Sequence, residues 1–109
     1  MFFQYRVDKD ITLELQTPFH ARELFDVVNE NRDFIGEHLA WVKKIQNPVD
    51  IKYYMKRDLM GMAQERRWAW LIRYKGRAVG RIGLFVTMPA LQECELYYFL
   101  GKRYTGKGI

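Results

Sequence analysis

The sequence contains few of the residues that build disulfide frameworks and metal sites. Its 109 residues include a single cysteine, Cys94, and two histidines, His20 and His38. One cysteine cannot form an internal disulfide bond, which is typical of a reducing compartment, so a cytoplasmic location is expected. Cys94 has no histidine partner at a recognisable spacing and is expected to be a small strand residue rather than a nucleophile. Neither histidine belongs to a cluster of cysteines or carboxylates, so no metal site is expected and both are predicted to lie on helix surfaces.

Long apolar runs are also missing. No uncharged stretch is long enough to cross a membrane, and the segment from Met1 to Arg6 lacks the charged, apolar and cleavage regions of a signal peptide. Internal repeats and low-complexity tracts are absent as well. What remains is a chain that is 49% hydrophobic and 16% aromatic. This composition excludes a disordered chain and predicts one small globular domain over residues 1–109.

Acidic residues are outnumbered by basic ones. The chain carries 18 Lys and Arg residues against 13 Asp and Glu residues, a formal net charge of +5. This balance favours an anionic partner, whether a nucleotide-like cofactor, nucleic acid or an acidic protein surface. Lys52, Lys56 and Arg57 share one stripe of a predicted helix. That stripe is either a solvated face or a surface that steers an anionic substrate.

The apolar pattern predicts an α/β (α+β) fold in which a mixed, mostly antiparallel sheet is flanked by helices. Thr17-Pro18 and Asn47-Pro48 each place a capping residue before a proline, the combination that starts helices. Lys75-Gly76 separates two alternating runs and predicts a hairpin turn. Expected helices cover about 18–30, 33–39 and 48–66. Residues 2–7 and 11–15 are expected to form one or two short strands, and further strands are expected at about 68–74, 78–86 and 93–100, with a loop at 88–92, in the order β, α, α, β, β, β.

Apolar residues at helical spacing identify the faces that are expected to be buried. Trp68 and Trp70 are also expected in the core, and Trp41 is expected to close the end of the core or to border an acceptor pocket. The unbroken run from Leu96 to Leu100 predicts a strand buried on both faces. The helical stripes are Ala21, Leu24, Phe25 and Val28 in the first helix and Ile51, Tyr54, Met55, Leu59, Met62 and Ala63 in the long helix.

The end of the chain carries the clearest functional pattern. The strand that ends at Leu100 is followed by Gly101, a short basic segment and Gly106-Lys107-Gly108. A buried strand that runs into a glycine-spaced turn presents several backbone N–H groups in one concavity, which suits phosphate oxygens. The sequence therefore predicts a site for a phosphate-bearing ligand after this strand.

Two glycine-containing motifs lie in the last third of the chain. The first is Val79-Gly80-Arg81-Ile82-Gly83-Leu84 in an expected strand, and the second is Tyr104-Thr105-Gly106-Lys107-Gly108-Ile109 after the last expected strand. After two amphipathic helices, this order resembles the GNAT superfamily of acetyl-CoA-dependent N-acetyltransferases. Asn31-Arg32, the segment 38–42 and the segment 95–100 further resemble the branch that acetylates N-terminal amines of ribosomal proteins. The resemblance covers nearly all of the chain but only the N-terminal half to two-thirds of a family domain. It implies that residues 1–109 are the N-terminal portion of one acetyltransferase domain, without the C-terminal strands and helices.

The resemblance implies acetyl-CoA as the cosubstrate and places its site at the end of the chain. The family's pyrophosphate loop reads Gln/Arg-x-x-Gly-x-Gly/Ala, and its first position falls on Thr105, which departs from that pattern. The last Gly/Ala of the loop would follow Ile109. The pantetheine arm is expected to pair with the strand backbone as an added strand does. The implied cofactor-binding residues are Phe99, Leu100, Thr105, Gly106, Lys107, Gly108 and Ile109.

The implied activity is transfer of an acetyl group from acetyl-CoA to a primary amine by direct attack in a ternary complex. The acceptor stays open between a protein N-terminus, a polyamine and a small-molecule amine. Glu95 matches a strand acid of many relatives and is the candidate general base, because burial beside an aromatic strand would suit it to accept a proton; Glu93 is the reserve. Alternatively, both are solvated or pair across strands with Arg73 or Arg81. The family's tyrosine acid lies in the part that this chain lacks, so the general acid is unidentified.

Two other interpretations remain. If the strand that ends at Leu100 forms the edge of the sheet, its apolar residues predict self-association, and the chain would be a non-catalytic, truncated homodimer. A nucleic-acid-binding module would need exposed aromatic residues beside lysines, whereas the aromatic residues stand at core-like spacings, which disfavours it. For the acetyltransferase interpretation, the isolated chain is expected to bind acetyl-CoA poorly and not to turn over, because the cofactor lies between the last strand and the next.

Overall fold

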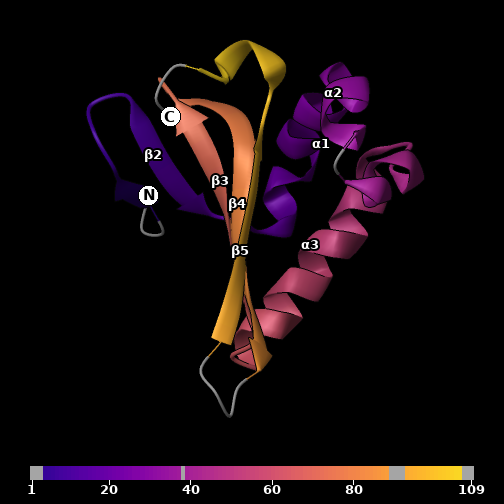
Figure 1. Ribbon diagram of the computed structural model, residues 1–109, viewed down its shortest axis with the longest axis vertical. Coiled ribbons are helices and arrows are strands. Elements are labelled where there is room, and N and C mark those ends of the chain that lie inside the picture. Colours follow the sequence, from indigo (N-terminus) through magenta and orange to yellow (C-terminus); the bar gives the residue numbers. More distant parts are fainter. Residues whose placement is uncertain (1–3, 38, 89–92, 107–109) are drawn as a thin grey trace.

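A computed structural model describes residues 4–37, 39–88 and 93–106. The described strands form one five-stranded sheet whose order in space follows the order in sequence, as Figure 1 shows. Every neighbouring pair is antiparallel. The predicted α+β class with a mostly antiparallel sheet is confirmed, and no parallel pair occurs among the described strands. The strands are β1 (Gln4–Arg6), β2 (Ile11–Leu15), β3 (Arg67–Tyr74), β4 (Arg77–Met88) and β5 (Glu93–Leu100).

The helices begin where the capping signals predict. The Asn47 side chain accepts the backbone N–H of Asp50 at 3.2 Å, and the Asp50 carboxylate accepts that of Asn47 at 3.3 Å, a reciprocal capping box. None of the described helices is both long enough and apolar enough to span a membrane. The helical elements are η1 (Pro18–His20), α1 (Ala21–Glu30), α2 (Arg32–Gly36), η2 (Ala40–Lys44), α3 (Pro48–Ala63) and η4 (Lys102–Tyr104).

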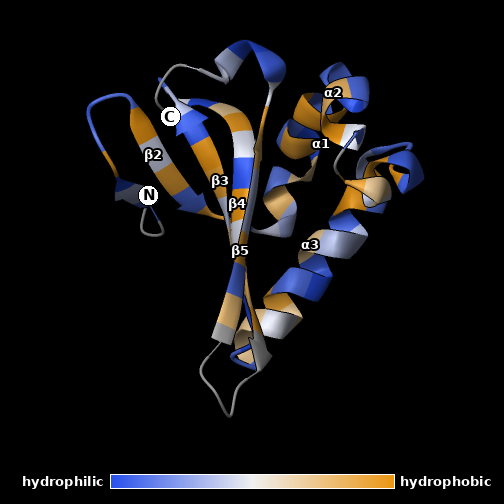
Figure 2. Cartoon of the chain, viewed as in Figure 1, coloured by the Kyte–Doolittle hydropathy of each residue, from blue (hydrophilic) through white to orange (hydrophobic). Residues whose placement is uncertain are grey.

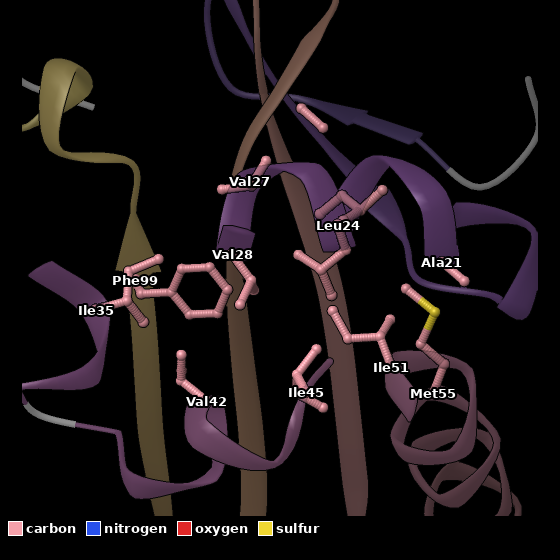
Figure 3. Close-up of a cluster of buried hydrophobic side chains, with 12 residues drawn as sticks. Ala21, Leu24, Val27, Val28, Ile35, Val42, Ile45, Ile51, Met55 and Phe99 are labelled. Carbon is pink, nitrogen blue, oxygen red and sulfur yellow. The ribbon is translucent and has the colours of Figure 1, made fainter. Parts of the chain in front are cut away.

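Helices α1, α2 and α3 lie on the same side of the sheet (Figure 1). The core forms between them and the facing side chains of the strands, and Figure 3 shows Phe99 of β5 pointing toward Val28 and Ile35 from the helical layer. Burial of each large apolar side chain contributes on the order of 2 kcal/mol, so this layer holds the fold together. The core residues are Ala21, Leu24, Val27, Val28, Ile35, Val42, Ile45, Ile51, Met55, Leu71, Ala78 and Phe99.

Strands β3 and β4 are joined by the predicted tight turn. Lys75 and Gly76 adopt φ angles of 51° and 83°, the left-handed pair that a two-residue hairpin turn requires. Further along β4, Gly80 faces Leu100 of β5. A Cβ atom at Gly80 would lie 2.1 Å from the carbonyl oxygen of Phe99, so only glycine allows β5 to approach this closely.

Helix α3 ends earlier than the sequence predicts. It was expected to continue to about residue 66, and it ends at Ala63. Glu65 takes the left-handed conformation, with φ of 59°, and the N–H of Arg66 bonds back to the carbonyl of Gly61 at 2.8 Å. Glycine or asparagine usually marks such a stop, and because a glutamate occupies this position, the sequence gives no warning of it.

Two sequence predictions are wrong on the face of the sheet opposite the helices: the burial of Trp68 and Trp70 in the core, and the burial of both faces of β5. Trp68 and Trp70 are half-buried and lie on this face, in line with Leu84 and Ile82 of β4, rather than in the core. Strand β5 is buried on one face only. Its residues alternate, so Phe99 is buried toward the helices, whereas Leu96 and Tyr98 remain 65% and 66% exposed. The continuous apolar run was therefore wrongly interpreted as two buried faces, since no described element covers the second one. Figure 2 shows how hydrophobic residues recur along these strands.

Candidate functional site

Strand β5 has one free edge along its whole length. It is the last strand of the sheet and pairs only with β4 in the part of the chain that the structure describes. The N–H of Gly101 donates to the carbonyl of Val79 at 2.8 Å, which establishes that residues 101 and 79 form a hydrogen-bonded pair of the β4–β5 ladder. Because hydrogen-bonded and non-bonded positions alternate in an antiparallel pair, the backbone groups of Leu96, Tyr98 and Leu100 face the free edge. Those of Phe99 face β4, so the predicted pairing of a ligand with this strand belongs at Tyr98 and Leu100.

A hollow of about 390 Å³ adjoins this edge. Its lining brings together three of the predicted site residues, Phe99, Leu100 and Thr105, with apolar side chains from α2 and the segment after it. The wall is apolar and the edge beside it offers backbone amides, a combination that suits an extended, amide-containing ligand. The lining residues are Phe34, Ile35, Leu39, Tyr98, Phe99, Leu100 and Thr105.

Two larger hollows, of about 690 and 720 Å³, are poorer candidates for an anionic ligand. The first is lined by Glu23, Asp26 and Glu30 of α1 as well as by basic residues. The second is lined by Asp33 and Glu37 as well as by Arg32 and Lys43. Carboxylates in the wall repel phosphate groups, so size alone does not select the site.

The turn after β5 is fastened to the end of α1. Asn31 accepts the backbone N–H of Lys102 at 2.9 Å, and its own amide donates to the carbonyl of Val27 at 2.8 Å. The Thr105 hydroxyl donates to the carbonyl of Lys102 at 2.7 Å, and Gly106 adopts a φ of 77°. The predicted nest thus begins with a defined turn. Its remaining predicted members, Lys107, Gly108 and Ile109, lie outside the described residues.

Arg32 carries out a related structural role. Its guanidinium donates to the carbonyls of Val42 and Ile45 in the segment that forms η2, and its Nε donates to Asn29 at 2.8 Å. Neighbouring residues 31 and 32 therefore hold two segments that border the hollow, the turn after β5 and the segment around η2.

Glu95 lies on the helix side of β5, two residues before Tyr97, and faces Phe85 of β4. It is exposed, so the burial on which the sequence argument relied is not present. The cross-strand alternative also fails for the described side chains, because Arg73 pairs with Glu14 and Glu23 and Arg81 pairs with Asp58. The side chain of Glu93 is not among those described. The catalytic role of Glu95 stays a prediction.

A buried polar cluster lies under β5, and the sequence interpretation missed it. Asp58 of α3 is 4% exposed and pairs with the Arg81 guanidinium and with the Gln16 side-chain amide, the latter at 3.0 Å. Arg81 also donates to the Tyr97 hydroxyl at 3.2 Å. A hollow of about 10 Å³ beside the cluster is the size of a single water molecule. The sequence contains one indication of this cluster: Asp58 stands among the apolar residues of α3, one turn after Met55.

Aromatic rings connect β5 to the surface of α3. Phe99 and Trp41 have ring centroids 6.0 Å apart, Trp41 and Tyr54 are also 6.0 Å apart, and Tyr54 lies 5.5 Å from Tyr53. Trp41 packs against the core as expected, and Tyr53 is 68% exposed. The row therefore leads from the hollow beside β5 to solvent on the outer face of α3.

A second network joins the sheet to α1. Arg73 donates to Glu14 at 2.6 Å and to Glu23 at 2.7 Å. The hydrogen bond from Arg73 lowers the pKa of Glu23 below its ordinary value, and the hydrogen bond to Glu23 in turn raises the pKa of Arg73. His20 is drawn into this network, with Nε2 3.3 Å from Glu14, while its Nδ1 accepts the N–H of Thr17 at 3.0 Å. The prediction of a helix-surface histidine was wrong for His20, because it caps η1; His38 lies outside the described residues.

No group of three potential metal ligands occurs within the described ranges. Cys94 is exposed on β5.

The chain belongs to the GNAT acetyltransferase family, since the family model "Acetyltransferase (GNAT) domain" matches residues 10–109. It is 26% identical over 113 aligned positions to the "Putative ribosomal N-acetyltransferase YdaF" of Bacillus subtilis (strain 168), covering 98% of this chain and 59% of that protein. The sequence resemblance to this superfamily is thereby confirmed, and the matched relative is itself named as a ribosomal N-acetyltransferase.

Solved structures show the same fold. RimL, a ribosomal L7/L12 alpha-N-protein acetyltransferase in complex with coenzyme A, superposes with a TM-score of 0.90 over 96% of this chain at 15% identity. The microcin C7 self-immunity acetyltransferase MccE, in complex with acetyl-CoA and AMP, gives a TM-score of 0.92 over the whole chain at 24% identity. The chain spans 59% and 61% of these two structures.

Proposed function

We propose that this chain forms the N-terminal part of an acetyltransferase that moves an acetyl group from acetyl-CoA to a primary amine in the cytoplasm. One observation carries the proposal: the hollow of about 390 Å³ beside the free edge of β5, which Phe99, Leu100 and Thr105 line together. Family membership supports the reaction class, and structures of relatives with coenzyme A or acetyl-CoA support the cosubstrate. The family match does not favour the alternative of a non-catalytic domain.

The residues present fit the chemical parts of acetyl-CoA. The free backbone groups of Tyr98 and Leu100 match the two amides of the pantetheine arm, which would add to the sheet as a strand does. The apolar walls from Phe34 and Leu39 suit its methylene and methyl groups. The turn at Gly106, which directly follows Thr105 of the hollow, suits the phosphate groups.

In the reaction, the free amine of the acceptor attacks the thioester carbonyl carbon. A nitrogen–carbon bond forms, the carbon–sulfur bond breaks, and coenzyme A leaves as the thiolate, which takes up the second proton that the nitrogen gives up as the amide forms. The incoming ammonium group first loses a proton, and Glu95, on the helix side of β5, is the proposed acceptor, directly or through water. For the acceptor, the names of the relatives favour a protein N-terminus over a polyamine or a small-molecule amine.

Amide chemical shifts provide the test, because they report weak binding and locate it. Acetyl-CoA added to the ¹⁵N-labelled chain should shift the amides of Leu96, Tyr98, Leu100 and Gly106. The amides of β1, the other edge of the described sheet, serve as the internal control and should not move. No shift up to millimolar ligand, or equal shifts at both edges, would overturn the proposed site.

A charge change at the turn tests the phosphate end of the same site. Thr105→Glu places a carboxylate where phosphate is proposed to bind and should weaken the acetyl-CoA response about tenfold. Gln64→Glu introduces the same charge at an exposed position beyond the far end of α3 and should leave the response unchanged. Equal effects of the two variants would show only nonspecific attraction to a basic protein.

A further inference from the structure

The positive charge of the chain is concentrated in one stretch. Residues 40–57, which form η2 and the first part of α3, hold five Lys and Arg residues against one Asp. This stretch therefore accounts for four of the chain's formal net charge of +5, and the rest of the chain holds 13 cations and 12 anions. All five cations are exposed, and we call them the basic surface: Lys43, Lys44, Lys52, Lys56 and Arg57.

The carboxylates nearest to the basic surface in the sequence are engaged elsewhere. Asp50 accepts the backbone N–H groups of Gln46 and Asn47 at 2.8 and 3.3 Å, which commits it to the start of α3. Asp58 points inward, is 4% exposed and pairs with Arg81. Neither pairs with a cation of the basic surface. Asp33 and Glu37 line the same hollow as Lys43. The charge directed at solvent therefore lies mainly on the three cations of α3, Lys52, Lys56 and Arg57.

Apolar and aromatic groups are exposed among these cations. Val49, Tyr53 and Met60 are 73%, 68% and 65% exposed on the same helix. Arg57 lies over the ring of Tyr54 with its guanidinium carbon 4.9 Å from the centroid. Tyrosine, methionine and arginine are among the residue types enriched where proteins bind polypeptides.

The basic surface is also connected to the proposed transfer site. The ring row from Tyr53 through Tyr54 and Trp41 to Phe99 advances in steps of 5.5, 6.0 and 6.0 Å. At about 3.3 Å per residue, roughly five residues of extended peptide cover that path. An acceptor held on α3 would therefore place its first residue beside β5.

From these observations we propose that the basic surface binds an acidic segment of the acceptor polypeptide, a few residues after the amine that is acetylated. The proposal rests on the proposed function and names its substrate class. A polypeptide fits better than a nucleic acid, because Tyr53 alone is an exposed ring here, while Trp41 and Tyr54 are packed against other rings and cannot stack on bases. Carboxylates of an extended peptide match the spacing of helix cations, and aliphatic or aromatic side chains between them match Val49 and Tyr53.

Binding is tested with peptides and without acetyl-CoA. The probe is a glutamate-rich peptide with a free amino terminus and a fluorophore at its carboxyl end, followed by anisotropy at low and moderate salt. A peptide with glutamine in place of glutamate and a single-stranded RNA oligonucleotide serve as competing probes. The variant Lys52→Glu, Lys56→Glu, Arg57→Glu reverses the basic surface, and the matched control Lys9→Glu, Arg22→Glu, Lys75→Glu makes the same charge change at exposed positions elsewhere.

The glutamate-rich peptide should bind the unaltered chain, and reversal of the basic surface should weaken this binding about tenfold or more. The control variant should stay within about twofold of the unaltered chain, and circular dichroism establishes that both variants are folded. Equal binding of the glutamine peptide, tighter binding of RNA, equal weakening by the control, or no peptide binding at all would each overturn the proposal. Because acetyl-CoA is absent, failure here is separate from failure of the cofactor site, which the amide shifts at β5 report.

Discussion

At the scale of single residues, Asp58 and Arg81 decide how α3 is held against the sheet. Their side chains are only 4% and 7% exposed, and the cluster also includes Gln16, Tyr97 and the less buried Arg67, whose guanidinium lies 3.7 Å from the Asp58 carboxylate. Removing one charge from such a pair leaves the other buried without compensation, whereas removing both is far less harmful. Asp58→Asn should therefore lower the free energy of unfolding by about 3 kcal/mol in urea denaturation.

The double variant Asp58→Leu, Arg81→Met is the control for this prediction. It replaces both charges by apolar side chains and should recover most of the stability that Asp58→Asn loses. The loss of stability in the double variant should be smaller than the losses of Asp58→Leu and Arg81→Met added together. A larger loss would contradict the interpretation of a buried, mutually dependent pair.

Glu23 gives a prediction for the dependence of stability on pH. Its folded-state pKa is lowered from 4.5 by the hydrogen bond from Arg73, so its contribution is present above about pH 4.5 and is lost as the pH falls through the lowered value. The side chain is 45% exposed, so solvent screens the pair and the contribution is modest. Glu23→Gln should cost about 0.5–1 kcal/mol at pH 7 by urea denaturation.

The same measurement repeated near pH 3 should show a smaller difference between Glu23→Gln and the unaltered chain. Glu30→Gln, on the same helix, removes a carboxylate whose nearest cation, Arg77, is 4.0 Å away and exposed, and it should change stability little at either pH. If the cost of Glu23→Gln grew as the pH fell, the assigned sign would be wrong.

At the scale of elements, the turn after β5 depends on a residue far away in the chain. Asn31 accepts the N–H of Lys102 at 2.9 Å, and this contact fastens the predicted phosphate-binding turn to the end of α1. Asn31→Ala removes the acceptor and should cost about 1 kcal/mol of stability. It should also speed hydrogen exchange at the Lys102 amide and weaken the amide shifts that acetyl-CoA causes at Gly106.

Asn29→Ala is the matched control, since Asn29 lies on the same helix and contacts only the neighbouring Arg32 side chain among the described hydrogen bonds. It should leave both exchange at Lys102 and the response at Gly106 unchanged. Equal effects of the two variants would show that loosening of α1, rather than the contact with Lys102, is responsible.

Structural features that depend on neighbouring residues were predicted from the sequence, whereas contacts between distant residues were not. Helix starts were predicted because the capping residue and the proline of Thr17-Pro18 and Asn47-Pro48 are adjacent in the chain, and the hairpin was predicted because Lys75-Gly76 fixes its own geometry. The site contacts were not predicted, because Asn31 and Lys102 are 71 residues apart, and Gln16 and Asp58 are 42 apart. Such partners are brought together only by the sheet order. The prediction that both faces of β5 are buried failed for the same reason, since the hydrophobicity of a strand does not specify which of its faces another element covers.

At the scale of the whole molecule, the sheet is one-sided. Helices cover one face (Figure 1). The other face presents Leu96 and Tyr98 of β5, in line across β4 with the half-buried Trp68 and Trp70 of β3. A free strand edge with exposed apolar residues is a template for association with another copy. The isolated 109-residue chain is therefore expected to self-associate at micromolar concentration, as sedimentation or light scattering would show.

Charges on this strand should prevent that association. Leu96→Lys, Tyr98→Lys places two cations on the exposed side of β5 and should shift the chain to the monomer, because a lysine on an edge strand opposes pairing with a second copy. Val49→Lys, Met60→Lys makes the same change at two apolar positions of α3 that are 73% and 65% exposed, and it should leave the association unchanged. A chain that is monomeric from the start, or that both variants dissociate equally, would exclude the β5 edge as the contact. If acetyl-CoA binds at that edge, it should compete with self-association, so added acetyl-CoA is expected to raise the monomer fraction of the unaltered chain.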